Sequence, residues 1–206
     1  MPQPQSATLE QTGTPSFGDR VQQYFRDFRV LRETHGEYWG VQVVNFIDCT
    51  VYFGLINIGT VFLSENVGLS DQGAGHSFMW FTTAVSICLL VSGTVTDWLG
   101  IRRSIYVAMG AQALLRAGLA VVGLVPSIPH RGLVATVLLV LMAPFIAMIQ
   151  TVFQAANKRY TTERSRSAGF SLWYLVMNIG AAGGGFLIDI IRLQLHVSNA
   201  HVFTFG

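Results

Sequence analysis

Asp48 is a carboxylate inside a long apolar stretch, and at helical spacing it shares a face with Asn45 and Tyr52. Burying a carboxylate near the middle of a membrane costs roughly 2.5–3.5 kcal/mol, so an acid in such a place is a candidate for function. A desolvated carboxylate can take up and release a proton. We therefore expect Asp48 to couple proton movement, with Asn45 and Tyr52 binding a substrate. The alternative is an aspartate that lies close enough to the membrane interface to be hydrated.

A second set of polar groups lies in the last apolar stretch. Tyr174, Asn178, Gly185 and Asp189 share one face of a helix, so a phenol, an amide and a carboxylate can line an aqueous cavity. We expect Tyr174 and Asn178 to bind substrate. The alternative for Asn178 is a hydrogen bond to a neighbouring helix and no contact with substrate.

Arg116 stands midway along a third apolar stretch. A long cationic side chain there is expected to snorkel outward or to bond polar groups of a neighbouring helix. If it faces inward, Asp48 or an anionic group of the substrate is its natural partner.

Other kinds of chemistry find no support. Cys49 and Cys88 have no C-x-x-C spacing, which argues against a disulfide framework or a zinc site. Phosphate-binding loops, H-E-x-x-H and nucleophile elbows are missing from the sequence. We expect no cofactor and no enzymatic activity. The net charge of +2 is too small to imply a nucleic-acid partner.

The elements that carry these residues are membrane spans. Hydrophobic residues make up 51% of the 206 positions and charged residues 12%, and the mean hydropathy is +0.46, which indicates an integral membrane protein. We predict an all-α membrane protein whose partner is the lipid bilayer. Five stretches each exceed the roughly 20 residues that cross the hydrocarbon core; they are 38–62, 78–98, 104–125, 133–153 and 168–191.

Basic residues fall mostly on one side of this topology. Ten of the 13 lie in segments that would face one side: Arg20, Arg26, Arg29, Arg32, Arg102, Arg103, Lys158, Arg159, Arg164 and Arg166. Only Arg131 and Arg192 fall on the other side, and Arg116 is within a span. Because short basic loops stay in the cytoplasm, we expect a multi-pass cell-membrane protein with a cytoplasmic N-terminus.

The two ends of the chain lie outside the five spans. Residues 1–18 are polar and are expected to form a disordered cytoplasmic tail. Residues 19–35 alternate apolar and basic positions at helical spacing, which predicts an amphipathic helix on the inner membrane surface, although a solvated helix fits the same pattern. Residues 38–206 would then be a partial bundle, because Val202–Gly206 has the composition of the start of a sixth span.

A short polar turn separates the second and third spans. It contains Gly93, Asp97, Gly100, Arg102 and Arg103 in the pattern G-x-x-x-D-x-x-G-x-R-R. This pattern resembles the cytoplasmic loop between the second and third helices of major facilitator superfamily transporters, although Trp98 stands where that family usually has a basic residue. The resemblance implies two six-helix halves, of which the C-terminal one is missing here, alternating access between them, and a gating role for this turn.

The fifth span resembles that of one particular family of transporters. Residues 169–181 read G-F-S-L-W-Y-L-V-M-N-I-G-A, which resembles the fifth-helix signature of proton-coupled oligopeptide transporters. The first span has Asn45 to Gly54 where those proteins carry E-x-x-E-R-F, and the span 133–153 holds no charge. The scaffold is therefore similar, whereas the proton-coupling and carboxylate-binding residues do not carry over position by position.

These observations lead to one preferred function. We expect a secondary active transporter that moves a small polar solute together with protons, with peptide-like molecules as one class of candidate. The runner-up is a membrane sensor or interaction protein that keeps the scaffold and no longer transports. The absence of the first-span arginine and of a fourth-span charge is what keeps this alternative open.

Overall fold

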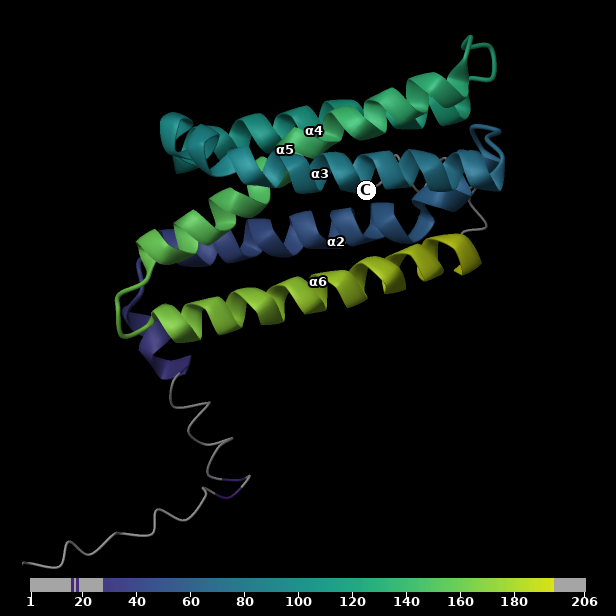
Figure 1. The fold of residues 1–206 in the computed structure, drawn as a ribbon. Coiled ribbons are helices and arrows are strands. Elements are labelled where there is room, and N and C mark those ends of the chain that lie inside the picture. The colour runs from purple at the N-terminus through teal and green to yellow at the C-terminus, as the bar shows by residue number, and fades with distance from the viewer. Residues whose placement is uncertain (1–15, 17, 19–27, 195–206) are drawn as a thin grey trace, which may run out of the picture.

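The computed structural model describes residues 16, 18 and 28–194. Five long helices make up most of this region (Figure 1): α2 (Gly36–Glu65), α3 (Asp71–Leu99), α4 (Ile101–Leu124), α5 (Arg131–Tyr160) and α6 (Arg166–Gln194). Each contains a segment long and apolar enough to cross a membrane. The all-helical fold expected from the sequence is thus present, and each helix begins before the span predicted for it.

Local signals explain where the helices start and stop. The Ser70 side chain accepts a hydrogen bond of 3.1 Å from the Gly73 amide, which caps α3 seven residues before its predicted span. Gly100 alone joins α3 to α4, with φ +77° and ψ 160°. Only glycine adopts this conformation readily, so the chain reverses at a single residue.

The helices pack mainly in three pairs, α3 with α5, α4 with α5, and α2 with α6. In Figure 1, α3, α4 and α5 lie together on one side, and α2 and α6 lie side by side on the other. The chain runs in the same direction in α2, α4 and α6 and in the opposite direction in α3 and α5, because short loops join consecutive helices. α5 also contacts α2 and α6, so it connects the two sides.

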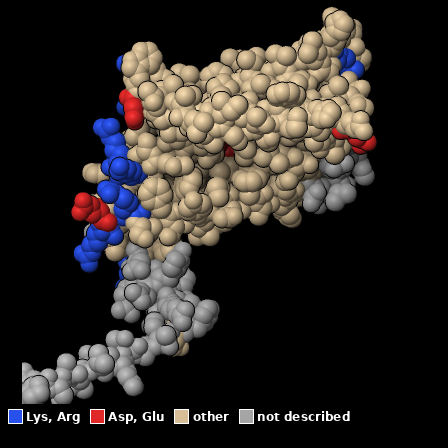
Figure 2. Space-filling view, in the orientation of Figure 1, with Lys and Arg blue, Asp and Glu red and all other residues tan. Residues whose placement is uncertain are grey.

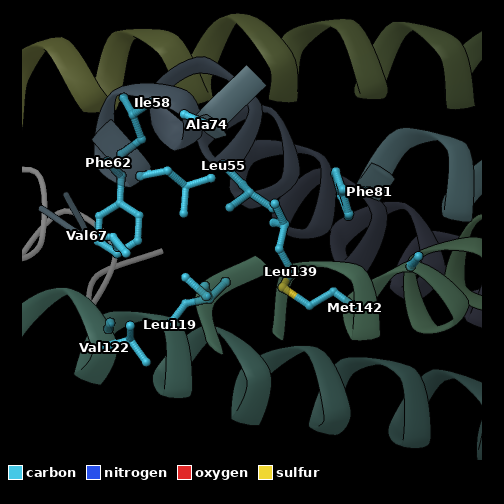
Figure 3. Close-up of a cluster of buried hydrophobic side chains, with 14 of the residues drawn as sticks. Leu55, Ile58, Phe62, Val67, Ala74, Phe81, Leu119, Val122, Leu139 and Met142 are labelled. Atoms are coloured by element: carbon cyan, nitrogen blue, oxygen red, sulfur yellow. The ribbon is translucent and has the colours of Figure 1, made fainter. Parts of the chain in front are cut away.

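Two apolar clusters fill the interior. The larger one gathers Leu55 and Phe62 from α2, Phe81 from α3, Leu119 from α4 and Leu139 from α5 (Figure 3). The smaller one lies towards the other end and includes Val41, Ile149, Val152, Phe153 and Trp173. Both clusters combine side chains from α2, α4 and α5.

Two glycines bring α6 against α2. A Cβ added at Gly180 would lie 2.9 Å from Cys49 Cβ, and one added at Gly184 would lie 2.5 Å from the Thr50 carbonyl oxygen. Real Cβ atoms essentially never come closer than about 3.0 Å to such neighbours. Gly180 and Gly184 have the G-x-x-x-G spacing that permits such a close helix contact.

Basic side chains gather at one end of the bundle. Figure 2 shows lysines and arginines clustered on the left, where α3 ends, α4 begins, α5 ends and α6 begins. We call this the basic end. It contains the exposed Arg102, Arg103, Lys158, Arg159 and Arg164. Arg131 lies at the opposite end and donates hydrogen bonds to the carbonyl oxygens of Val122, Gly123 and Asn66.

The N-terminal predictions are only partly covered. Most of the expected tail 1–18, residues 19–27 of the expected amphipathic helix, and 195–206 with the start of a sixth span lie outside the described residues. The described part of this segment contains a short 3-10 helix, η1 (Val30–Glu33), where Leu31 is buried against Tyr38 and Ala168. The placement of 19–35 on the membrane surface stays a prediction.

Candidate functional site

A buried polar cluster joins α2 to α4. Asp48 of α2 and Arg116 of α4 are each 8% exposed, and the two side chains interact electrostatically. Arg116 Nη1 donates a 3.1 Å hydrogen bond to the Val51 carbonyl oxygen, and Nη2 donates one of 3.4 Å to Gln112 Oε1. Two opposite charges are thus buried in the same region of the bundle, near enough to interact through space.

The structure decides between the interpretations of Arg116. The side chain does not snorkel outward, because it is buried and bonded to α2. It donates to a backbone carbonyl of the neighbouring helix α2, and Asp48, the inward partner considered for it, is near enough to interact with it through space. Asp48 is likewise enclosed by protein and lies more than two turns from the start of α2 at Gly36.

Asn45 and Tyr52 flank Asp48 along α2. Asn45 is fully buried and its Oδ1 accepts a 3.5 Å hydrogen bond from the Cys49 thiol. Tyr52 is half-buried and packs against the larger apolar cluster. The shared face expected from the spacing is therefore an interior face of the bundle.

Tyr174 and Asn178 are not brought to this cluster. Both are exposed on α6, where Asn178 Nδ2 donates a 2.8 Å hydrogen bond to the Tyr174 carbonyl oxygen. The neighbouring stripe of Gly180 and Gly184 is the one that faces α2. The expected substrate-binding residues thus form two separate groups, one inside the bundle and one on its surface. The side chain of Asp189 lies outside the description.

The turn between α3 and α4 lies at the basic end. Asp97, Arg102 and Arg103 are exposed around Gly100. Gly93 lies one turn before Asp97 on α3, and a Cβ added there would meet nothing within 4 Å. The five predicted gating residues are therefore close in space and accessible at one end of the bundle, with room beside Gly93.

Sequence inspection missed several polar residues of the interior. Gln112 precedes Arg116 by four residues and Gln42 precedes Asn45 by three. Helical spacing from a polar residue already singled out could therefore have identified both glutamines. Two hydroxyl pairs also join α3 to α5, Ser77 with Thr136 at 2.8 Å and Ser92 with Thr151 at 2.5 Å. Each pair spans 59 positions, which shows that α3 and α5 run in parallel and in constant register.

The donor sets of the described residues do not resemble a metal centre. No group of three or more His, Cys, Asp or Glu side chains there can hold an ion.

Comparison with known proteins decides the family. The family model of the Major Facilitator Superfamily matches residues 7–194, which is most of the chain. The chain belongs to the major facilitator superfamily. Members are multi-pass membrane proteins that transport rather than catalyse, so the expected transporter class is confirmed in these general terms. Neither a curated protein nor a solved structure matched this major facilitator chain. The nearer resemblance to oligopeptide transporters is not confirmed.

Proposed function

We propose that this major facilitator chain belongs to a proton-coupled secondary transporter that moves a small polar solute by alternating access. The observation that carries the proposal is the enclosed Asp48–Arg116 pair in a family of transporters. Removing one charge from a buried pair leaves the other uncompensated, at a cost of about 3–5 kcal/mol. Protonation of Asp48 would leave the charge of Arg116 uncompensated. This cost would favour a rearrangement of the contact between α2 and α4.

A movement of α2 relative to α4 would also displace α6. α2 is packed closely on α6 through Gly180 and Gly184. α6 carries Tyr174 and Asn178 on its exposed face, where a phenol and an amide offer donors and acceptors to a polar solute. Proton binding at Asp48 and solute binding at α6 are thus connected through a contact that tolerates little independent movement.

The class of solute follows from what the site contains. The fifth-span pattern around Tyr174 and Asn178 favours a peptide-like molecule. A free carboxylate on the solute would bind best to a cationic side chain. Arg116, the one buried arginine of the described spans, already donates to Val51 and interacts with Asp48. We therefore keep the broader class of small polar solutes.

The gate and the orientation complete the proposal. The basic end faces the cytoplasm, because positively charged loops are retained there. Gly93, Asp97, Gly100, Arg102 and Arg103 form a gate at this end, with Asp97 contacting one of the arginines in one state and releasing it in the other.

Transport in vesicles tests this function. The full-length protein is reconstituted in proteoliposomes, a pH gradient is imposed, and uptake of a labelled dipeptide, amino acid or sugar is followed. We expect one of these probes to accumulate above its external concentration and to leak back when a protonophore collapses the gradient. Protein-free vesicles are the control. Equilibration without accumulation for every probe would contradict proton coupling.

A further inference from the structure

Gln112 in α4 is a buried side chain with only one half of its amide hydrogen-bonded. It is 4% exposed, and its Oε1 accepts the 3.4 Å hydrogen bond from Arg116 Nη2. Its Nε2 is buried as well and makes no hydrogen bond of standard geometry. Because buried polar groups in proteins are nearly always hydrogen-bonded, this N–H group requires an explanation.

The register between α2 and α4 places Gln112 near Asp48. Arg116 Nη1 reaches the Val51 carbonyl oxygen, and the chain runs in the same direction in the two helices. Gln112 lies four residues before Arg116, and Asp48 lies three residues before Val51. These steps correspond to about 6 Å and about 4.5 Å along the two helix axes. Gln112 is therefore level with Asp48 to within about one turn.

The chemistry of the two charged groups fixes the orientation of the amide. The Gln112 side chain interacts with the Asp48 carboxylate, although its Nε2 stays short of a hydrogen bond of standard geometry. An ionised carboxylate only accepts hydrogen bonds, so it can bond the N–H half of an amide. A guanidinium only donates, so Arg116 can bond the C=O half, as it does.

The two charges are not bonded to each other directly. Among the described residues, Arg116 donates to Val51 and to Gln112 and makes no hydrogen bond to Asp48. Asp48 and Arg116 nevertheless interact through space. The other titratable groups that interact with this carboxylate in the described structure are Cys49 and Tyr52, both on α2. The Gln112 amide is thus the neutral group that can contact both charges.

We propose that Gln112 is the positioning residue of the Asp48 site, where its amide bridges the two charges by accepting from Arg116 and donating from Nε2 to the Asp48 carboxylate. This inference deepens the proposed coupling role of Asp48 and rests on it. Hydrogen bonds to an ionised group are roughly twice as strong as bonds between neutral groups. Protonation of Asp48 therefore weakens the Nε2 bond, and the amide transmits this change to Arg116 and α4.

Gln112→Met tests the bridge, because methionine keeps the length of the side chain and removes both hydrogen-bonding atoms. Gln150→Met is the matched control, since Gln150 is a half-buried glutamine of α5 that takes no part in the contacts of Asp48 and Arg116 described above. The full-length proteins are reconstituted in nanodiscs. Infrared spectra report the carboxylate stretch of ionised Asp48, identified by its loss in Asp48→Asn. ¹⁵N NMR spectra report the guanidinium of Arg116, identified by its loss in Arg116→Lys.

We expect Gln112→Met to shift both signals and Gln150→Met to shift neither, because one amide bonds both charges. A shift of the Arg116 signal alone would mean that Gln112 bonds only within α4, and this result would overturn the bridge. Two unchanged signals would overturn it as well.

Gln112→Glu is the second variant, in case the methionine variant does not fold. Glutamate keeps the shape of the side chain and an oxygen for Arg116, and its ionised form has no N–H donor for Asp48. The Asp48 band should again shift while the Arg116 guanidinium stays hydrogen-bonded, and an unchanged Asp48 band would contradict the proposal. If Asp48→Asn keeps proton-driven accumulation in proteoliposomes while Gln112→Met shifts both signals, the bridge stands and the coupling role falls.

Discussion

Arg116 Nη1 in α4 donates a hydrogen bond of 3.1 Å to the carbonyl oxygen of Val51 in α2, across 65 positions of sequence. The bond lies within one turn of Asp48, so one side chain both ties two helices together and compensates a buried charge. The stability of the bundle and the chemistry of the candidate site therefore depend on the same residue.

Arg116→Leu should destabilise the bundle by about 3–5 kcal/mol, because it leaves Asp48 buried without a counter-charge. Equilibrium unfolding in detergent micelles measures this loss. Asp48→Asn in the same chain should restore part of it, since the uncompensated charge is then gone. A double variant no more stable than Arg116→Leu alone would show that the two side chains are not energetically coupled.

Gly100→Ala should cost roughly 1–3 kcal/mol, because alanine is strained at φ +77° and ψ 160°. Gly93→Ala is the matched control in the same segment. It lies inside α3 with nothing within 4 Å of an added Cβ, so it should be neutral or stabilising by about 0.5–1 kcal/mol. Thermal unfolding of both variants decides the matter, and equal melting temperatures would contradict the backbone argument.

Gly184→Ala should separate α6 from α2. Its methyl group would meet the Thr50 carbonyl oxygen, and such overpacking typically costs about 1–3 kcal/mol. Gly183→Ala, with open space around its Cβ, should leave stability unchanged or slightly improved. The comparison uses unfolding in micelles, and a neutral Gly184→Ala would mean that the two helices are free to move apart.

The orientation of the chain is tested by cysteine labelling in a background without Cys49 and Cys88. Single cysteines are introduced at Gln72, near the start of α3, and at Glu163, between α5 and α6; both positions are exposed. A membrane-impermeant thiol reagent on intact cells should label Gln72→Cys alone, with Glu163→Cys labelled after permeabilisation. Labelling of Glu163→Cys in intact cells would reverse the orientation.

Much of the fold follows from the sequence. Five apolar stretches longer than the membrane core predict five helices, and Gly100 predicts the reversal between α3 and α4. The stripe of Gly180 and Gly184 predicts the close contact with another helix, which the structure identifies as α2. These signals are local, because each depends on residues within a few turns of one another.

The arrangement of the candidate site depends on more than local spacing. Spacing shows that Asn45, Asp48 and Tyr52 share a face, and that Tyr174 and Asn178 share another. It does not show which neighbour covers a face, because lipid and the bundle interior are equally apolar. The packing of α4 on α5 decides that Arg116 reaches α2 near Asp48, while Tyr174 and Asn178 remain exposed.

The coupling role of Asp48 is tested most directly by comparing two modes of transport in Asp48→Asn. Asparagine keeps the shape of the side chain and cannot titrate, so the carrier should still exchange labelled for unlabelled solute but no longer accumulate solute against its gradient. The measurement is uptake and counterflow in proteoliposomes across a pH series. The account predicts retained counterflow, lost accumulation and a flat pH dependence. Accumulation that persists and still varies with pH would show that the proton is carried elsewhere.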